Sequence, residues 1–418
     1  MVSLHALSGT VWWQVALFAL AGSVAVALLV GCRTRAATAL SLVLLVSLQA
    51  RNPLVLNAGD TLLRRLLFWG LLLPLGERWA VDIVGDEPRD VVAGLASAGL
   101  LLQVVAVYVQ NAVFKFRADT WPSGRAVRLV FSLDQFTVLA GDLLATAPAL
   151  LTAINWVWLV LLLCSPLLLV VTGRARALLV GAFAGAHLGM ALTISIGLFP
   201  LVSVAALLPF LPPVVWDRVW PSSEPSLDWL ANRLPRGSPL PSIGSLNRLR
   251  RPLLATVLVV LLLSNAVTLG VVSVAQSTAP DKSWDMFAPT PPLTDGWFVA
   301  PATTTDGETV DALHGGPVTW ERPPDLASTY PSSRWRKYSM QLRGDNAEPL
   351  RRSLALVAFL CQRWTASHER DLAEVRLVFV AEPTRLGKPE PRERRPLGTY
   401  ACGPKGQQSS APGPSAGT

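Results

Sequence analysis

The sequence is poor in charged residues. Only 15% of its 418 residues are Asp, Glu, Lys or Arg, whereas soluble domains carry about a quarter. The shortage is concentrated in the first two-thirds of the chain, where long stretches have no charge at all. This composition argues against an ordinary water-soluble fold for that part of the chain.

Cysteine is also scarce, with four in the whole chain. Cys32 and Cys164 lie in or beside apolar stretches, and we interpret them as small hydrophobic residues. No pair of cysteines has the spacing of a metal site. Cys361 and Cys402 lie in the more polar final third, where they could form a disulfide if that part is outside the cytoplasm.

Long apolar runs take the place of the missing charges. A membrane-spanning helix needs about 20 mostly apolar residues, and the runs 11–31, 91–114, 154–172 and 253–274 satisfy this. Further candidates are shorter or interrupted, namely 36–50, 62–75, 126–150 and 177–213, the last divided at Gly197 and Pro200. The sequence therefore predicts an all-α polytopic membrane bundle of about seven to nine segments.

The pattern changes after the last apolar run. Short β-prone stretches appear at 297–299, 317–320 and 375–380, with Val375, Leu377 and Phe379 on one face. The stretch 350–364 has helical spacing of its apolar residues. We predict a membrane domain over 1–276, a small α+β domain over 277–402 and a disordered tail over 403–418, which is rich in Gly, Ser, Pro and Gln.

The basic excess belongs to the predicted membrane domain. Up to Gln276 the chain has 19 basic and 12 acidic residues, against 17 and 16 from Ser277 onward. Basic residues mark helix ends and attract anionic lipids, so the predicted partner is the lipid bilayer. Nucleic acid is not expected, because no basic stretch interleaves with aromatic residues on a soluble surface.

Arginines also predict the orientation of the last run. Arg248, Arg250 and Arg251 precede it and favour the cytoplasmic side. The α+β domain is therefore expected outside the cytoplasm, on a multi-pass protein of the cell membrane. Arg33 and Arg51 flank one short segment and favour opposite orientations for it.

Four groups of residues carry a family resemblance. They are Arg33-Thr34-Arg35 through Arg51-Asn52-Pro53 to Gly59-Asp60; Leu73-Pro74-Leu75-Gly76-Glu77-Arg78-Trp79 with Val81-Asp82; Val113-Phe114-Lys115 leading to Asp119 and Trp121; and His187 with Ile196-Gly197-Leu198-Phe199. In this order and spacing, the chain resembles bacterial members of the horizontally transferred transmembrane (HTTM) domain family, relatives of the vitamin K-dependent γ-carboxylase. The later stretches Trp284-Asp285-Met286-Phe287-Ala288-Pro289 and Trp335-Arg336-Lys337-Tyr338 resemble bacterial members only.

The resemblance has an implication for the start of the chain. Similar proteins have one more hydrophobic helix before the stretch that begins here at Met1. We therefore expect that such a helix is missing, which would account for the conflict around Arg33 and Arg51.

The resemblance implies a candidate base, Lys115. It matches the lysine thought to deprotonate reduced vitamin K, so a reduced quinone is the implied cofactor. A neutral amine there could act as general base on a quinol hydroxyl. The alternative is a lysine that ends a helix and extends toward the membrane surface.

Two further ionisable residues are candidates. His187 lies inside an apolar run and could bond a quinone oxygen or transfer a proton, or it could be a neutral histidine bonded to a neighbouring helix. Asp60 lies where the animal carboxylase has an Asn-His pair, and this chain has Gly59-Asp60 instead. That departure puts the full carboxylation chemistry in doubt and favours a helix-capping role for Asp60 or a pairing with Arg64.

Asp134 and Asp142 interrupt the run 126–150. Eight residues apart, they are expected on one helix face, where each would pair with a cation such as Arg64 or Arg128. A polar cavity is the alternative.

Two functions stay open. One is a membrane enzyme, carboxylase-like or quinol-dependent, that acts on a quinone or other lipid-soluble substrate through Lys115 and His187. The other is a non-catalytic membrane scaffold or transport partner. A secondary transporter would be expected to contain an internal repeat, and none is evident in the sequence.

Overall fold

A computed structural model describes residues 3–81, 91–219, 244–270, 284–343 and 347–403. The predicted tail 403–418 lies outside these residues except for Gly403. The chain divides into two compact units. The first comprises Met1–Gly124, Ala153–Ala191 and Leu198–Thr290, and the second comprises Arg125–Thr152, Leu192–Gly197 and Pro291–Thr418.

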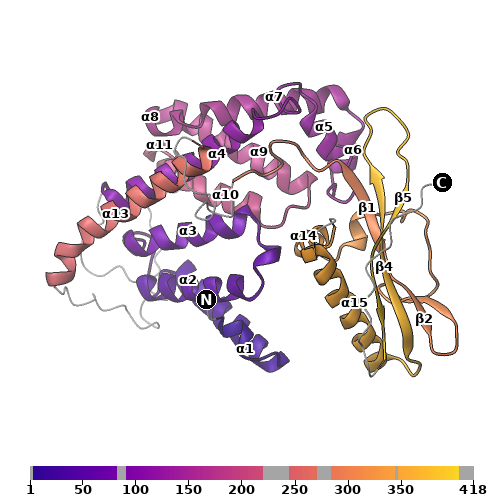
Figure 1. Ribbon diagram of the computed structural model, residues 1–418. Coiled ribbons are helices and arrows are strands. Elements are labelled where there is room, and N and C mark those ends of the chain that lie inside the picture. Colours follow the sequence, from indigo (N-terminus) through magenta and orange to yellow (C-terminus); the bar gives the residue numbers. More distant parts are fainter. Residues whose placement is uncertain (1–2, 82–90, 220–243, 271–283, 344–346, 404–418) are drawn as a thin grey trace. The chain divides into compact units, whose positions relative to one another are not determined.

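The first unit is built from helices (Figure 1). Their bounds are α1 Val11–Leu29, α2 Thr34–Arg51, α3 Ala58–Leu72, α4 Leu95–Lys115, α7 Pro148–Cys164, α8 Leu167–Val170, α9 Gly173–Thr193, α10 Phe199–Leu207, α11 Pro213–Val219 and α13 Gly244–Leu269. α7 and α9 each extend by a few residues into the second unit. An apolar core joins several of these helices through Val104, Tyr108, Leu162, Phe183 and Phe210.

Four described helices are long and apolar enough to cross a membrane: α1, α4, α9 and the Arg251–Leu269 part of α13. A fifth span is possible only if the pair Phe199–Phe210 and Pro213–Val219, bent by 109°, counts as one. The expected number of seven to nine segments is therefore not confirmed. α7 has 17 residues, and α3 has 15 residues with Arg64 and Arg65 in it, which makes both too short to meet the same test.

Helices α4 and α13 run in the same direction. Ala96 and Leu100 of α4 share an apolar cluster with Leu254 of α13. Further along, Gln110 donates a hydrogen bond to Asn265, and Arg117, just after α4, donates to the carbonyl of Leu269 at 3.0 Å. The residue numbers rise together on both helices, so the two helices end on the same side.

The second unit contains an antiparallel sheet of five strands. The strands are β1 Thr294–Val299, β2 Pro301–Thr304, β3 Thr309–Asp311, β4 Leu372–Pro383 and β5 Glu393–Ala401. β1 pairs with Val378–Pro383 of the long strand β4, and β2 pairs with the start of that strand, from Leu372 to Val375. β5 pairs with residues 374–381 of the same strand, so β4 is the centre of the sheet.

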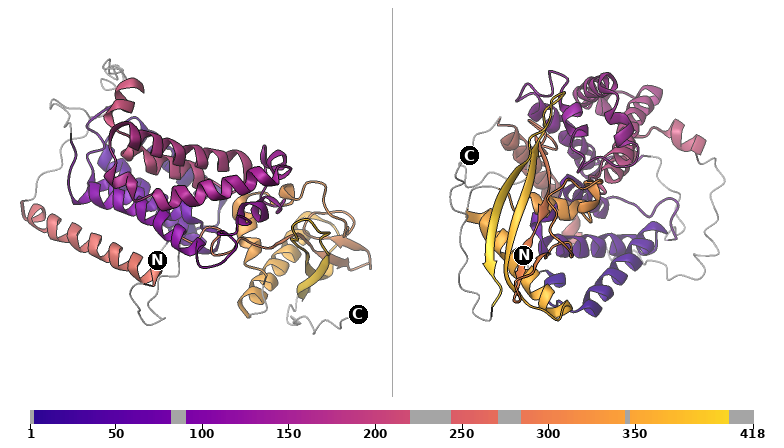
Figure 2. Two further views of the ribbon diagram at one scale, coloured as in Figure 1. Left: turned by 90° about the horizontal axis from the view of Figure 1, so that it is seen from above. Right: turned by 90° about the vertical axis from the view of Figure 1, so that its right-hand side faces the viewer.

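Two helices accompany the sheet, α14 Ser333–Met340 and α15 Ala347–Ser367. α15 packs against β4 and β5, and the two views of Figure 2 show it beside the strands. The core between them includes Val357, Leu360, Val375, Leu377 and Phe379. The predicted helix 350–364 and the predicted face of strand 375–380 are both confirmed.

The predicted strand 317–320 is wrong, since no strand forms there. Val318 and Trp320 instead pack on the other face of the sheet, beside Trp297 and Val380. Pro317 has no backbone N–H to donate to a sheet, and the apolar side chains after it become partly buried by covering the sheet.

The predicted membrane segment 126–150 is also wrong. It contains two short helices, α5 Ala126–Phe131 and α6 Gly141–Ala145, joined by non-helical chain. Asp134 lies between the helices and Asp142 in the first turn of α6, so the two do not share one helix face. Asp134 pairs with Arg322 at 2.5 Å rather than with the expected Arg64 or Arg128.

Candidate functional site

A stripe of polar residues runs along α4 toward its C-terminal end. Tyr108, Asn111 and Lys115 are spaced by three and four residues, which places them on one face of the helix. All three are buried. The stripe is therefore a polar line inside an otherwise apolar helix.

Lys115 is the last residue of α4 and is only 1% exposed. Its Nζ donates to the carbonyl of Met286 at 2.9 Å. The same Nζ lies 3.5 Å from the centre of the Trp121 ring, in cation–π contact. The amine is thus held by a carbonyl and an aromatic face.

The segment Trp284–Pro289 covers the end of this stripe. Asn111 Nδ2 donates to the carbonyl of Trp284 at 3.0 Å, and Trp121 Nε1 donates to the carbonyl of Phe287 at 2.9 Å. The Trp284 side chain is itself buried in the helical core. Three donors from the α4 region therefore fix three carbonyls of a segment about 170 residues further along the chain.

His187 lies on α9 and is fully buried. Its Nε2 lies 3.0 Å from the hydroxyl of Tyr108. The ring is surrounded by aromatic side chains, with Trp158 and Phe199 at edge-on contacts of 5.6 Å between ring centres. Its Nδ1 is buried and has no hydrogen-bond partner among the residues that the structure describes.

Tyr108 connects the two predicted site residues. It contacts His187 directly and lies two helical turns before Lys115, about 10 Å along the axis. No hydrogen bond joins His187 and Lys115 themselves within the described part of the chain. The structure therefore places His187 and Lys115 along one line of polar residues, and it does not bring the two side chains into contact with each other.

Asp60 has a different environment. Its Oδ2 accepts a 2.8 Å bond from the backbone N–H of Asn57, and its own N–H donates to Asn57 Oδ1 at 3.2 Å. This reciprocal pair is a capping box, with Asn57 rather than Asp60 as the N-cap. Arg64, the expected partner of Asp60, instead donates a 2.9 Å hydrogen bond from its Nη1 to Gln49 Oε1.

Gly59 has a packing role beside the same site. A Cβ at this position would lie 2.7 Å from the Cα of Phe199. Phe199 in turn contacts the ring of His187. The glycine thus brings the start of α3 close to the aromatic surroundings of His187.

Tyr108 and Asn111 were not singled out from the sequence, and Met286 was quoted only within its family stretch. The first two carry a usable signal, since polar residues at three- and four-residue spacing from Lys115 stand out in an apolar helix. Met286 carries none, because only its backbone carbonyl takes part. The stretch 284–289, which the sequence analysis quotes for its resemblance to bacterial members, also contributes through the packing of Trp284.

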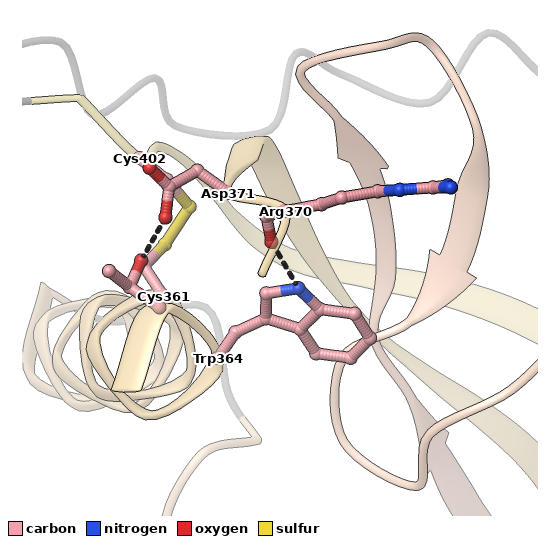
Figure 3. Close-up of a disulfide and its surroundings, with 6 residues drawn as sticks. Cys361, Trp364, Arg370, Asp371 and Cys402 are labelled. Atoms are coloured by element: carbon pink, nitrogen blue, oxygen red, sulfur yellow. Dashed lines mark hydrogen bonds between the residues drawn. A yellow bond between two sulfur atoms is a disulfide. The ribbon is translucent and has the colours of Figure 1, made fainter. Parts of the chain in front are cut away.

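The C-terminal unit has a covalent link. Cys361 on α15 and Cys402 after β5 form a disulfide with Cα atoms 5.7 Å apart (Figure 3). Beside it, Trp364 Nε1 donates to the carbonyl of Arg370 at 3.0 Å, as the dashed line in Figure 3 shows. The disulfide joins the end of the last strand to the helix that covers the sheet.

No group of three or more His, Cys, Asp or Glu side chains within the described ranges could hold a metal ion. Asp295, Glu382 and Asp134 do gather, but around a cation of the chain itself, Arg322.

Comparison with known proteins places the chain in a family. No curated protein and no solved structure matches it. The pattern that defines the HTTM domain matches residues 3–216, just over half of the chain. This stretch includes α4 with Lys115, α9 with His187 and the capping box at Asp60. The chain therefore belongs to the HTTM domain family.

Proposed function

We propose that this protein is a multi-pass membrane enzyme that acts on a quinol or another lipid-soluble substrate with an acidic hydroxyl, and that Lys115 is its general base. One observation carries the proposal. Lys115 is buried and, among the described residues, forms no ion pair, so that a carbonyl and an indole face are the groups in contact with its amine, while Asp285 acts on it only from a longer distance. Burying an amine that no carboxylate contacts is costly, and lysines in such surroundings serve in proton transfer.

The proton-transfer step uses the neutral amine. Its lone pair accepts the proton of the substrate hydroxyl, and the electron pair of the O–H bond stays on the substrate oxygen. The resulting ammonium is stabilised by the Met286 carbonyl and by the Trp121 ring, the two groups that already contact Nζ. His187, with an unpartnered Nδ1, provides a group that can bond a second substrate oxygen.

The proposal does not extend to glutamate carboxylation. Gly59-Asp60 replaces the Asn-His pair of the animal carboxylase, and Asp60 is engaged in a capping box. We assign Asp60 a role in helix α3 and none in proton transfer. The proposed chemistry is thus confined to deprotonation of a hydroxyl, with oxidation of the quinol as its measurable consequence.

The test is quinol oxidation by the purified full-length protein, with dissolved oxygen as the electron acceptor. Lys115→Met should lower the rate by a factor of about 100 or more, the usual contribution of a general base. Arg117→Gln is the matched control, because Arg117 is an exposed cation at the same helix end, and its rate should stay near that of the wild type. Equal rates for the wild type and Lys115→Met would remove Lys115 from the mechanism.

A non-catalytic scaffold is the second candidate. The observation in its favour is that Lys115, Asn111 and Trp121 all donate to backbone carbonyls of one segment. Hydrogen bonds of this kind would serve to hold that segment against α4. It predicts that the wild type oxidises no quinol and that Lys115→Met lowers only the melting temperature. The two measurements together separate the candidates.

We also propose that the C-terminal α+β domain lies outside the cytoplasm. Arg248, Arg250 and Arg251 at the start of α13 support this orientation, and a disulfide between Cys361 and Cys402 suits an oxidising compartment. Alkaline phosphatase fused after Thr418 should be active, and a green fluorescent protein fused there should be dark. The reverse pattern would place the domain in the cytoplasm.

A further inference from the structure

Amide side chains lie along the contact between α4 and α13. Gln110 donates from Nε2 to Asn265 Oδ1, and Asn265 Nδ2 donates to the carbonyl of Leu261 at 2.6 Å. Gln103 differs from both. It is 4% exposed, and neither its Oε1 nor its Nε2 has a hydrogen-bond partner in the described part of the chain.

A small pocket separates Gln103 from α13. It is lined by Gly99, Leu102, Gln103, Leu258, Leu261, Leu262 and Asn265. The volume of the pocket is about 10 Å³, which is close to the volume that one water-sized group needs. Leu262 is 47% exposed, so this wall of the pocket reaches the outer surface of α13.

The chemistry of the lining limits what can bind. A glutamine amide offers donors on Nε2 and an acceptor on Oε1. Among the oxygen groups of uncharged lipids, a hydroxyl can accept from one and donate to the other, whereas a ketone or an ether oxygen only accepts. No charged side chain lines the pocket, so an ionised ligand would be left without a countercharge.

The depth of the pocket limits the ligand further. Gln103 lies eight residues after the start of α4 and twelve before its end, about 12 Å and 18 Å along the axis. If α4 crosses the bilayer as proposed, Gln103 is well inside the hydrocarbon region. The charged headgroup of a phospholipid stays at the interface, and therefore does not reach this point.

We propose that this pocket binds the hydroxyl group of an uncharged lipid-soluble molecule, a long-chain alcohol or a quinol. The oxygen accepts from Gln103 Nε2 and donates to Gln103 Oε1, while the apolar body lies along Leu258 and Leu262. The proposal rests on the membrane placement of α4 and not on proton transfer at Lys115. The two residues are about 18 Å apart along the helix, so one small polar head cannot contact both.

The test is photo-labelling of the full-length protein in lipid nanodiscs. The probe is a long-chain primary alcohol that carries a diazirine several carbons from the hydroxyl, and the matched probe is its methyl ether. The alcohol should label peptides around Leu258–Asn265 about tenfold more than the ether, because the ether cannot donate to Oε1, and the loss of one hydrogen bond of about 1.4 kcal/mol corresponds to a factor of ten. Gln103→Leu should lower the alcohol signal by a similar factor, and Lys115→Met should leave it unchanged even if no quinol turnover is found.

A second pair of variants keeps Gln103 intact. Leu262→Trp fills the pocket from α13 and should abolish the labelling. Leu263→Trp changes the next residue, which is exposed and does not line the pocket, and should leave the labelling in place. Both should melt near the wild-type temperature, so that loss of fold is excluded.

Competition then distinguishes the two sources of the hydroxyl. Displacement of the probe by unlabelled quinol or by unlabelled alcohol supports the proposal and names the ligand. Equal labelling by alcohol and ether, or labelling that Gln103→Leu does not alter, would overturn it and leave the pocket with a water molecule only.

Discussion

The carboxylate of Asp295 accepts two successive backbone N–H groups, that of Asp134 at 2.7 Å and that of Gln135 at 3.3 Å. Asp295 is the second residue of β1, and it is 1% exposed. Arg336 binds the same short segment, donating to the carbonyl of Gln135 at 2.6 Å. Strand β1 and helix α14 of the second unit therefore hold the chain between α5 and α6, the strand through a carboxylate and the helix through a guanidinium.

Asp295 should make the stability of this unit depend on pH. Burial, together with the negative charge of Asp134, raises the pKa of Asp295 to about 7. In the unfolded chain the group has its ordinary pKa of 3.8, so between these values the folded state binds a proton that the unfolded state has released. The contribution of Asp295 to stability is then full below pH 3.8 and is lost as the pH rises toward 7.

The measurement is the melting temperature of the purified protein from pH 4.5 to 8, for the wild type and Asp295→Asn. The amide keeps an acceptor for the Asp134 N–H and does not titrate. The variant should therefore lose less stability than the wild type over this range. Parallel curves for the two proteins would show that Asp295 is ionised throughout.

Replacement of Arg336 by lysine should lower the stability of the protein. Its guanidinium donates to the carbonyls of Gln135 and Ser195 and stacks over Phe136, with 4.2 Å from Cζ to the ring centre. A lysine keeps the charge but loses the planar fork, so one buried carbonyl is left without a partner at about 1–3 kcal/mol. Arg336→Lys should melt several degrees lower, whereas Arg351→Lys, at an exposed ion pair with Glu348, should change little.

Removal of the disulfide should destabilise the C-terminal domain. The bond closes a loop with a sequence separation of 41 residues, and loops of this size are worth about 2–4 kcal/mol. Cys361→Ser with Cys402→Ser should unfold at lower denaturant concentration than the oxidised wild type. The intact protein should also show no reactive thiol at either position under oxidising conditions, and two labelled cysteines there would refute the pairing.

The spacing of apolar residues along the chain correctly predicted the helix and the strand that each bury one face. The stripe on α15 and the alternation of Val375, Leu377 and Phe379 both reflect one buried face, and a buried face follows from periodicity alone. The resemblance of Val113-Phe114-Lys115 and His187 to a known family located two residues that Tyr108 connects.

The errors arose where distant residues decide the structure. The run 126–150 is apolar enough to suggest a membrane helix. Its Asp134, however, pairs with Arg322, 188 residues away, and this pairing places the segment in the second unit. Likewise, the buried amine of Lys115 has its hydrogen-bond partner, the carbonyl of Met286, 171 residues further along the chain. Neither partner can be identified from local spacing, since a backbone carbonyl has no sequence signature.

Gly99 should be intolerant of even a methyl group. It lies within α4, and a Cβ there would come within 2.2–2.6 Å of three atoms of the Trp69 ring. Trp69 is 1% exposed and packs with Ala96, Leu100 and Leu254, so its ring cannot move without opening this cluster. Gly99→Ala should therefore destabilise the protein by about 1–3 kcal/mol, the usual cost of overpacking.

Gly181 in α9 is the matched control, because a Cβ at that position meets nothing within 4 Å. A helical glycine in open space gains about 0.5–1 kcal/mol when it is replaced by alanine, through the smaller loss of backbone entropy. The two Gly→Ala variants should therefore shift the melting temperature in opposite directions. If both raise it, the contact between α4 and Trp69 has room for a methyl group, and the close packing of α3 on α4 at this point is contradicted.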